Sequence, residues 1–232
     1  MISSFHDFNT SGFNSKKRSI PKIIHIIWVG DQSKRPNHFI NSWIEKNPDW
    51  QVKLWENNIL TSHPWYNAKH IESLLPYGKF HGISDMMRYE ILFLEGGLYV
   101  DADSFCVRPL EDWLFDSDIC LGWENEHTRP GLICNNVMAA APKNPFFSQL
   151  IETIQKKNTV LGLPLWQLTG PQLVTDIHRE NPQHNYTLWP SHYFTPSHHT
   201  GASYSGKGHV FAKHIWGFTK GQNNNLAEIG ID

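Results

Sequence analysis

The stretch SDMMRYEILFLEGGLYVDAD, residues 84–103, predicts a helix, a stop and a short strand in immediate succession. Apolar side chains at helical spacing favour a helix over residues 85–95, with Ser84 as its N-cap. The pair Gly96-Gly97 suits the left-handed backbone that ends many helices. The apolar run that follows is typical of a buried strand, and it ends at Asp101-Ala102-Asp103. We therefore expect two carboxylates at the end of a strand in the protein core.

The chain on either side of this stretch alternates between predicted strands and helices. Strands are predicted at 23–29, 51–55, 118–123 and 133–141, and helices at 38–46, 68–75, 145–157 and from 169–171 onward. This alternation predicts an α/β fold with a central, mostly parallel sheet flanked by helices. We expect a flexible lead-in over residues 1–19, one domain over 20–220 and a mobile C-terminal tail over 221–232.

The composition narrows the class of protein. The 232 residues carry 20 Lys and Arg against 22 Asp and Glu, without the basic surplus that a nucleic-acid binder normally shows. Three cysteines in apolar surroundings, Cys106, Cys120 and Cys134, fit no zinc pattern and are typical of reduced thiols. The sequence shows neither a signal peptide nor a transmembrane stretch. We expect a cytoplasmic protein, and a peripheral association with a membrane stays open.

Asp101 and Asp103 suit a hard divalent cation. Two carboxylates this close disfavour joint ionisation unless a cation lies beside them. Mg²⁺ or Mn²⁺ prefers such oxygen ligands and keeps positions open for phosphate oxygens. The cation would neutralise a nucleoside diphosphate leaving group. A D-x-D triplet alone is weak evidence, because many surface turns carry one by chance.

The preceding helix strengthens this hypothesis. Asp85 and Arg88 are three residues apart and share one helix face. An ordinary intrahelical ion pair would explain them equally well. The strand that follows the same helix carries Asp101, however, so the helix could present both side chains toward the metal site.

The order S-D-x-x-R-Y … G-G-x-Y-x-D-x-D within residues 84–103 resembles the signature of glycosyltransferase family 32. That family includes fungal initiating mannosyltransferases and capsular-polysaccharide transferases, and is more distantly similar to the clostridial glucosylating toxins. IPKIIHIIWVG at residues 20–30, Thr169-Gly170-Pro171 and His214-Ile215-Trp216 resemble weaker landmarks of the family. Gly217-Phe218 follows where the family pattern has a second Trp. The sequence therefore does not define which residues form the C-terminal donor lid.

The resemblance implies a GT-A fold, Rossmann-like and specific for nucleoside-diphosphate sugars, and a metal-assisted reaction with retention at the anomeric carbon. The donor would be a UDP- or GDP-hexose, and the acceptor a glycan, lipid or protein. Asp103 would bind the metal directly, and Asp101 would contact the ribose or the metal through water. Asp85 and Arg88 would hold the donor sugar. The resemblance gives two further roles: Trp28 near the base, unless it is a plain core residue, and His214 at the metal or diphosphate, unless it is an ordinary exposed histidine.

Fainter signals suggest further site residues. Trp123 and Glu124 could bind an acceptor sugar, although a solvated loop explains them as well, and Trp166 could add an acceptor wall. Asn136 could face the donor sugar or form a turn. The cluster His192, His198 and His199 suggests zinc only weakly, because its spacing is irregular and neither Cys nor an acid accompanies it.

Two other functions stay open at this level. A phosphohydrolase of the haloacid-dehalogenase type also places D-x-D after an apolar strand, but it needs a paired acidic motif downstream. A carbohydrate-binding or effector module could keep the fold without turnover. The complete set Asp85, Arg88, Asp101 and Asp103 argues against such a module.

Overall fold

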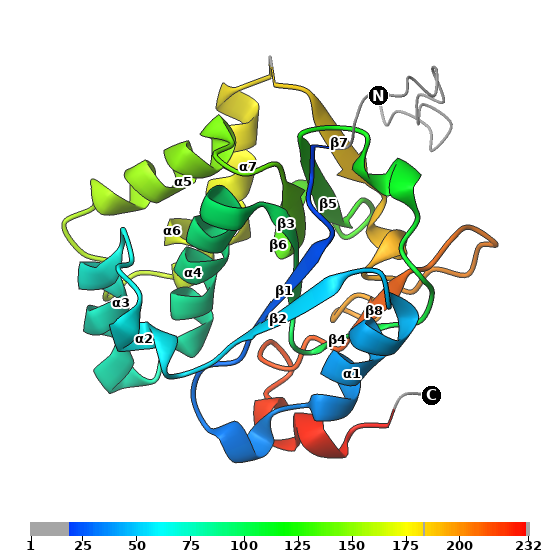
Figure 1. Cartoon of the computed structure of the whole chain (residues 1–232), viewed down its shortest axis with the longest axis horizontal. Coiled ribbons are helices and arrows are strands. Elements are labelled where there is room, and N and C mark those ends of the chain that lie inside the picture. Colours follow the sequence, from blue (N-terminus) through cyan, green and yellow to red (C-terminus); the bar gives the residue numbers. More distant parts are fainter. Residues whose placement is uncertain (1–18, 183, 231–232) are drawn as a thin grey trace.

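A computed structural model describes residues 19–182 and 184–230, and its core is one six-stranded sheet (Figure 1). The strand order is β2-β1-β3-β6-β5-β7, and a separate two-stranded sheet joins β4 to β8. The strands are β1 (Ile23–Ile27), β2 (Gln51–Trp55), β3 (Gly97–Asp101), β4 (Ser104–Cys106), β5 (Ile119–Asn125), β6 (Arg129–Ala140), β7 (Tyr186–Trp189) and β8 (Ala212–His214). In the large sheet only β6 runs against its neighbours, so the expected α/β fold with a mostly parallel sheet is confirmed.

Helices cover both faces of the sheet. The α-helices are α1 (Asn37–Lys46), α2 (Ile59–Ser62), α3 (Ala68–Leu74), α4 (Phe80–Glu95), α5 (Pro145–Gln155), α6 (Leu165–Leu168) and α7 (Pro171–Glu180). Short 3-10 turns are η1 (Gln32–Lys34), η2 (Leu75–Tyr77), η3 (Asp112–Phe115), η4 (Ser191–Tyr193) and η5 (Asn223–Glu228). Figure 1 shows α4, α5 and α7 on one side of the sheet and α1 on the other.

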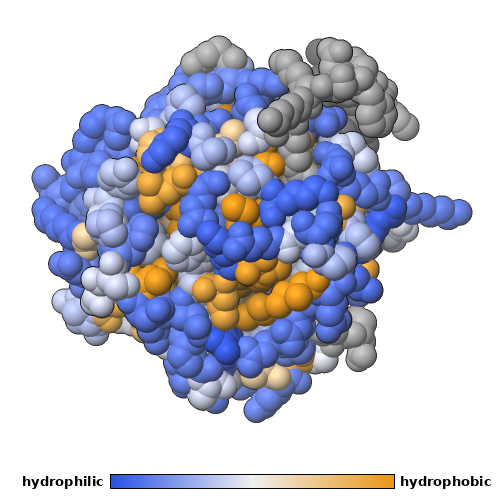
Figure 2. All heavy atoms as spheres, in the orientation of Figure 1, coloured by the Kyte–Doolittle hydropathy of each residue, from blue (hydrophilic) through white to orange (hydrophobic). Residues whose placement is uncertain are grey.

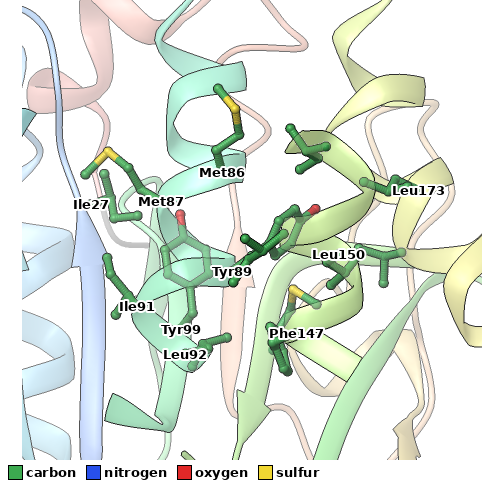
Figure 3. Close-up of a cluster of buried hydrophobic side chains, with 14 of the residues drawn as sticks. Ile27, Met86, Met87, Tyr89, Ile91, Leu92, Tyr99, Phe147, Leu150 and Leu173 are labelled. Atoms are coloured by element: carbon green, nitrogen blue, oxygen red, sulfur yellow. The ribbon is translucent and has the colours of Figure 1, made fainter. Parts of the chain in front are cut away.

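Side-chain alternation along β3 divides the core into two clusters. Tyr99 packs with the α4, α5 and α7 cluster, whereas Leu98 and Val100 pack with the α1 cluster. Successive residues of a strand point to opposite faces, so a fully apolar strand needs a helix layer on each side. Figure 3 shows Met87 and Ile91 of α4 between that helix and the sheet.

Helix α4 begins earlier than the sequence predicts. It starts at Phe80, so Ser84 lies inside the helix and the prediction of a Ser84 cap is wrong. Gly82 is a weak helix former, so helix propensity alone favours a start of α4 after this residue. The structure explains the glycine by packing, because a Cβ there would lie 2.8 Å from Leu165 Cδ1.

The predicted stop at Gly96-Gly97 is confirmed, and it serves two purposes. Both residues have positive φ, 67° and 100°, which side-chain-bearing residues rarely adopt. A Cβ on Gly97 would also lie 2.5 Å from the carbonyl oxygen of Ile23 in β1. The glycines therefore let α4 turn directly into β3 against the neighbouring strand, which positions Asp101.

His25 ties this junction to β1 as a neutral side chain. Its Nδ1 accepts a hydrogen bond from Trp55 Nε1 at 3.1 Å, so its Nε2 carries the proton and donates to the Gly96 carbonyl at 2.8 Å. The ring is fully buried. Burial lowers the His25 pKa from 6.5 to about 4, because the charged form would lose its water.

We expect His25 to make the protein less stable as the pH falls from about 6.5 to about 4. The unfolded chain takes up a proton in this window and the folded chain does not, so the free energy of unfolding falls by up to about 3 kcal/mol. Urea unfolding at pH 7 and pH 5 measures the loss. His25→Gln should be less stable than the wild type at pH 7, but its free energy of unfolding should fall less between pH 7 and pH 5. His127→Gln, at an exposed histidine, should lose as much as the wild type; equal losses in all three proteins would contradict the prediction.

Part of the predicted C-terminal tail, residues 221–232, contacts the domain through Leu226 and Ile229, although most of its described residues are exposed. Leu226 is 1% exposed and packs with Phe39 and Phe105. His38 contacts the carbonyl of Ile229 at 2.7 Å. Apolar residues spaced too widely to form a periodic pattern make these contacts. The predicted lead-in, apart from its last residue, lies outside the described residues.

None of the described helices is long and apolar enough to cross a membrane. The face shown in Figure 2 is mainly hydrophilic, with apolar side chains gathered near its middle.

Candidate active site

A cavity of about 800 Å³ lies where β1 and β3 end. Ligands of open α/β sheets bind at this edge, beyond the carboxyl ends of the parallel strands. The cavity is lined by residues from β1, β3, α4, β5, β6, α6 and β8 and from the segments after β1, β3 and β8. They include all but one of the site residues predicted from the sequence: Trp28, Asp85, Arg88, Asp101, Asp103, Glu124, Asn136, Trp166 and His214. Only Trp123 is not among them.

Asp101, Asp103 and His214 form a compact cluster in this cavity. His214 Nε2 lies 2.9 Å from Asp103 Oδ1 and 3.5 Å from Asp101 Oδ2. The pairing of β4 with β8 places Ser104 opposite His214, which brings the histidine to the D-x-D turn. The Gly217 N–H donates to Asp103 Oδ2 at 2.6 Å.

Mutual charge sets the protonation of this cluster. Burial alone would lower the His214 pKa, but Asp103 and Asp101 raise that pKa to about 10. Burial opposes ionisation of Asp103 as well, and His214 nonetheless lowers the Asp103 pKa. Without a cation, the protonated imidazole thus supplies the positive charge that the two carboxylates need.

The same three side chains fit a divalent cation. One ligand atom from each lies within 4.8 Å of the other two; the His214 side chain is buried and the Asp103 side chain is 14% exposed. His214 Nδ1 is buried and has no hydrogen-bond partner in the described part of the chain. Two carboxylates with one imidazole suit Mn²⁺ or Mg²⁺ better than a thiol-preferring metal.

Arg88 joins helix α4 to the D-x-D turn. Its Nη1 lies 3.2 Å from Asp101 Oδ1, and its Nη2 lies 3.2 Å from Asp85 Oδ1. The guanidinium also stacks over the Tyr99 ring at 4.4 Å and donates to the Asn135 carbonyl. Burial opposes its charge, yet Asp101 and its other partners raise the Arg88 pKa, so it stays charged. Helix α4 thus presents Asp85 and Arg88 toward the site, as the sequence suggested.

Asp85 is a buried carboxylate with three polar partners: Arg88, Asn135 and Thr169. Asn135 Nδ2 donates to Oδ1 at 2.7 Å and Thr169 Oγ1 donates to Oδ2 at 3.0 Å. Burial raises the Asp85 pKa to about 7, although Arg88 acts in the opposite direction. Sequence reasoning missed Asn135 and Thr169 as its partners, even though both lie in motifs that it noticed, Asn135-Asn136 and Thr169-Gly170-Pro171.

Trp28 and Asn136 both face the cavity. Trp28 is half-buried, packs against core side chains and donates its Nε1–H to the Asp31 carbonyl at 3.0 Å. Trp28 thus packs in the core and also lines the cavity, and its place near the base stays a prediction. Asn136 is buried, and its Oδ1 has no hydrogen-bond partner in the structure as described, so this oxygen can accept a bond from a ligand.

The three weakly predicted acceptor residues separate in the structure. Glu124 is 5% exposed and Trp166 is 40% exposed, and both line the cavity. Trp123 instead packs against the α4, α5 and α7 cluster and does not line the cavity. The structure therefore corrects its prediction as a residue that binds an acceptor sugar. Neighbouring residues of β5 face opposite sides of the sheet, which allows only one of Trp123 and Glu124 to face the cavity.

The histidine cluster also differs from expectation. His198 and His199 lie with Glu124 in a group whose ligand atoms are within 4.8 Å of one another, so an acid does accompany them. Glu124 is 74 residues away in the chain, which hides the contact from spacing arguments. His192 stacks on Tyr204 instead, at 4.1 Å between ring centroids. The three cysteines are free, as predicted, and all three are buried.

Comparison with known proteins agrees with this site. Residues 33–119 match the family described as glycosyltransferase sugar-binding region containing DXD motif. Inositol phosphoceramide mannosyltransferase 3 of Schizosaccharomyces pombe is 30% identical over 157 residues, which cover 64% of this chain and 41% of that protein. Subversion of eukaryotic traffic protein A of Legionella pneumophila is 25% identical over 171 residues, 61% of this chain and 26% of that protein. The chain spans less than half the length of the curated relatives it matches first.

Solved structures show the same fold. The UDP-bound glycosyltransferase domain from the YGT toxin superposes with a TM-score of 0.55 and 9% identity, covering 74% of this chain and 80% of that one. A glycosyltransferase involved in glycosylation of the major capsid of PBCV-1 gives a TM-score of 0.52 and 11% identity, covering 89% and 98%. The GT-A fold expected from the sequence is confirmed. The chain is thus similar over residues 33–119 to the glycosyltransferase sugar-binding region that contains the DXD motif, in agreement with its family 32 resemblance.

Proposed function

We propose that this protein transfers a hexose from a UDP- or GDP-sugar to a glycan, lipid or protein acceptor, with retention at the anomeric carbon. The observation that carries the proposal is the cluster of Asp101, Asp103 and His214 in the cavity, linked through Arg88 to Asp85. The UDP bound by a structural relative and the mannosyltransferase activity named for sequence relatives support it. Retention rests on the family 32 resemblance.

In this proposal Asp103 and His214, with Asp101 near, would hold a cation, Mn²⁺ or Mg²⁺, which when bound would supply charge neutralisation to the leaving diphosphate. Asp101 also accepts a hydrogen bond from the donor ribose. Arg88, which its carboxylate partners fix in position, helps to hold the donor sugar. Asp85 accepts hydrogen bonds from donor-sugar hydroxyls, and Asn136 offers its buried Oδ1 to the same sugar. Trp28 offers its ring to the base.

The location of the protein is also part of the proposal. We infer a cytoplasmic enzyme that associates peripherally with a membrane when its acceptor is a lipid. The lipid substrate named for the S. pombe relative supports the second part.

The rival functions have less support. A phosphohydrolase of the haloacid-dehalogenase type needs a second acidic pair at the D-x-D. Among described residues, the cluster there contains only Asp101, Asp103 and His214. A non-catalytic binding module has no need for the buried network around Arg88, whose charges are costly to keep out of water.

A donor screen tests the proposal. Purified protein is incubated with UDP- and GDP-hexoses, with EDTA, Mg²⁺ or Mn²⁺, and released nucleoside diphosphate is measured. We expect hydrolysis of donors with one base, at least tenfold faster with a cation than with EDTA. p-Nitrophenyl phosphate turnover without donor hydrolysis would favour the phosphohydrolase. Glycan binding that survives EDTA, without any hydrolysis, would favour the binding module.

A further inference from the structure

A second buried carboxylate faces the cavity apart from the proposed cation site. Glu124, near the end of β5, is 5% exposed and belongs to a different cluster from Asp101, Asp103 and His214. Burial raises the pKa of the Cys134 thiol, and the nearby carboxylates of Glu124 and Asp101 raise it further. Both carboxylates therefore lie close to one residue of β6. A carboxylate at this position can accept a hydrogen bond from a hydroxyl group.

His198 orients this carboxylate. The Thr200 backbone N–H donates to His198 Nδ1 at 3.3 Å, so the proton of the neutral ring lies on Nε2. Nε2 then donates to Glu124 Oε1 at 3.2 Å. Arg129 Nη1 lies 3.5 Å from the same oxygen. All contacts of the carboxylate within the described chain thus fall on Oε1, which leaves Oε2 able to accept a hydrogen bond from a ligand.

Zinc is a poorer explanation of the same side chains. Glu124, His198 and His199 offer a common zinc donor set. However, the Nε2 of His198 carries the proton that it donates to Glu124. The Arg129 guanidinium beside the carboxylate would also repel a cation. Hydrogen bonding to an organic ligand fits the arrangement better.

Trp166 supplies an apolar surface next to this carboxylate. It is 40% exposed on α6, lines the cavity, and has the Arg129 guanidinium 5.3 Å from its ring centroid. A half-exposed indole beside a carboxylate acceptor and a guanidinium donor matches a ring with an apolar face and hydroxyl edges. An amino-acid hydroxyl would use the carboxylate but not the flat surface.

We propose that Glu124, Arg129 and Trp166 form an acceptor subsite for a polyhydroxylated ring, with His198 as the residue that positions Glu124. The reacting part of the acceptor is then a sugar-like ring, even where the whole acceptor is a lipid or a protein. This inference rests on the proposed transferase function, and it selects one acceptor class within it.

The test compares transfer with donor hydrolysis. The protein is incubated with the donor that it hydrolyses in the screen and with one acceptor at a time: a methyl α-hexoside, a methyl β-hexoside or a Ser/Thr-rich peptide. Each acceptor is present at about 100 mM, because a single sugar binds weakly. We expect a disaccharide product with at least one hexoside and no glycopeptide. Glu124→Gln should lose at least tenfold of the transfer rate, with donor hydrolysis within about twofold of the wild type.

Two further variants separate positioning from folding. His198→Gln keeps an N–H donor for Glu124, so it should retain several-fold more transfer than His198→Ala, mainly through a lower acceptor KM. Glu126→Gln is the matched control. Its carboxylate contacts Ser191 and does not line the cavity. Glu126→Gln should change neither the transfer rate nor the rate of donor hydrolysis.

The outcomes are distinguishable. A wild-type protein without donor hydrolysis would contradict the proposed function itself. Donor hydrolysis without transfer to any hexoside, transfer to the peptide, or an equal loss of both rates in Glu124→Gln would overturn only the acceptor subsite. Zinc that survives dialysis against EDTA in the wild type, but is lost in His199→Ala, would overturn it too.

Discussion

Asp103→Asn is expected to lower cation-dependent donor hydrolysis by about 10²–10³-fold, as removal of a group that stabilises transition-state charge typically does. Asp103 is the proposed direct metal ligand: its side chain is mostly buried, one of its oxygens contacts His214 and the other accepts from the Gly217 N–H. Asparagine keeps the shape and one acceptor oxygen but removes the charge. Hydrolysis is measured with saturating Mn²⁺, and Mn²⁺ binding is measured by calorimetry with donor present.

The variant should still fold. His214 can release its proton when the Asp103 charge is gone, so the cluster is not left with an unpaired buried charge. Circular dichroism and thermal unfolding check this point. Asp116→Asn, at an exposed acid, is the control and should keep wild-type hydrolysis. Wild-type turnover in a folded Asp103→Asn protein would exclude Asp103 as the essential ligand.

Local sequence patterns were sufficient for the elements that carry the D-x-D motif. Strand β3 and the Gly96-Gly97 stop depend on neighbours within a few residues, so apolar periodicity and glycine chemistry predict them well. The start of α4 was missed because Gly82 disfavours a helix by propensity, whereas in the fold it packs closely against Leu165, more than eighty residues away. Propensity contains no information on such a contact.

The parts of the site that depend on distant pairing were harder to predict. His214 reaches Asp103 only because β8 pairs with β4, and the family resemblance, not spacing, indicated it. The contact between Glu124 and His198 had no signal at all. Each histidine looked like one of 14, and the acid that completes the cluster lies on another strand.

Arg88→Lys is expected to lower kcat/KM for the donor by at least a hundredfold, or about 2.7 kcal/mol of transition-state stabilisation. Lysine keeps the charge but cannot contact Asp85 and Asp101 together, because it lacks the planar fork of arginine. It would also lose the stacking over Tyr99. Donor hydrolysis kinetics with saturating cation measure the effect.

A surface pair on α7 provides the matched control. Asp176 and Arg179 have the same i,i+3 spacing, but their side chains are half or more exposed. Such a pair contributes only a few tenths of a kcal/mol, so Arg179→Lys should leave both activity and stability unchanged. If Arg88→Lys costs less than about tenfold, or 1.4 kcal/mol, Arg88 is a structural residue and not part of the donor site.

Arg88→Ala separates the two roles further. It leaves Asp85 and Asp101 without their shared cation, and breaking a buried ion pair typically costs about 3–5 kcal/mol. Asp85 should partly escape this cost by taking up a proton, since burial already raises its pKa to about 7. The loss of stability in Arg88→Ala should therefore be smaller at pH 6 than at pH 8. A loss independent of pH would show that packing of the Arg88 side chain, and not its charge, holds α4 against β3.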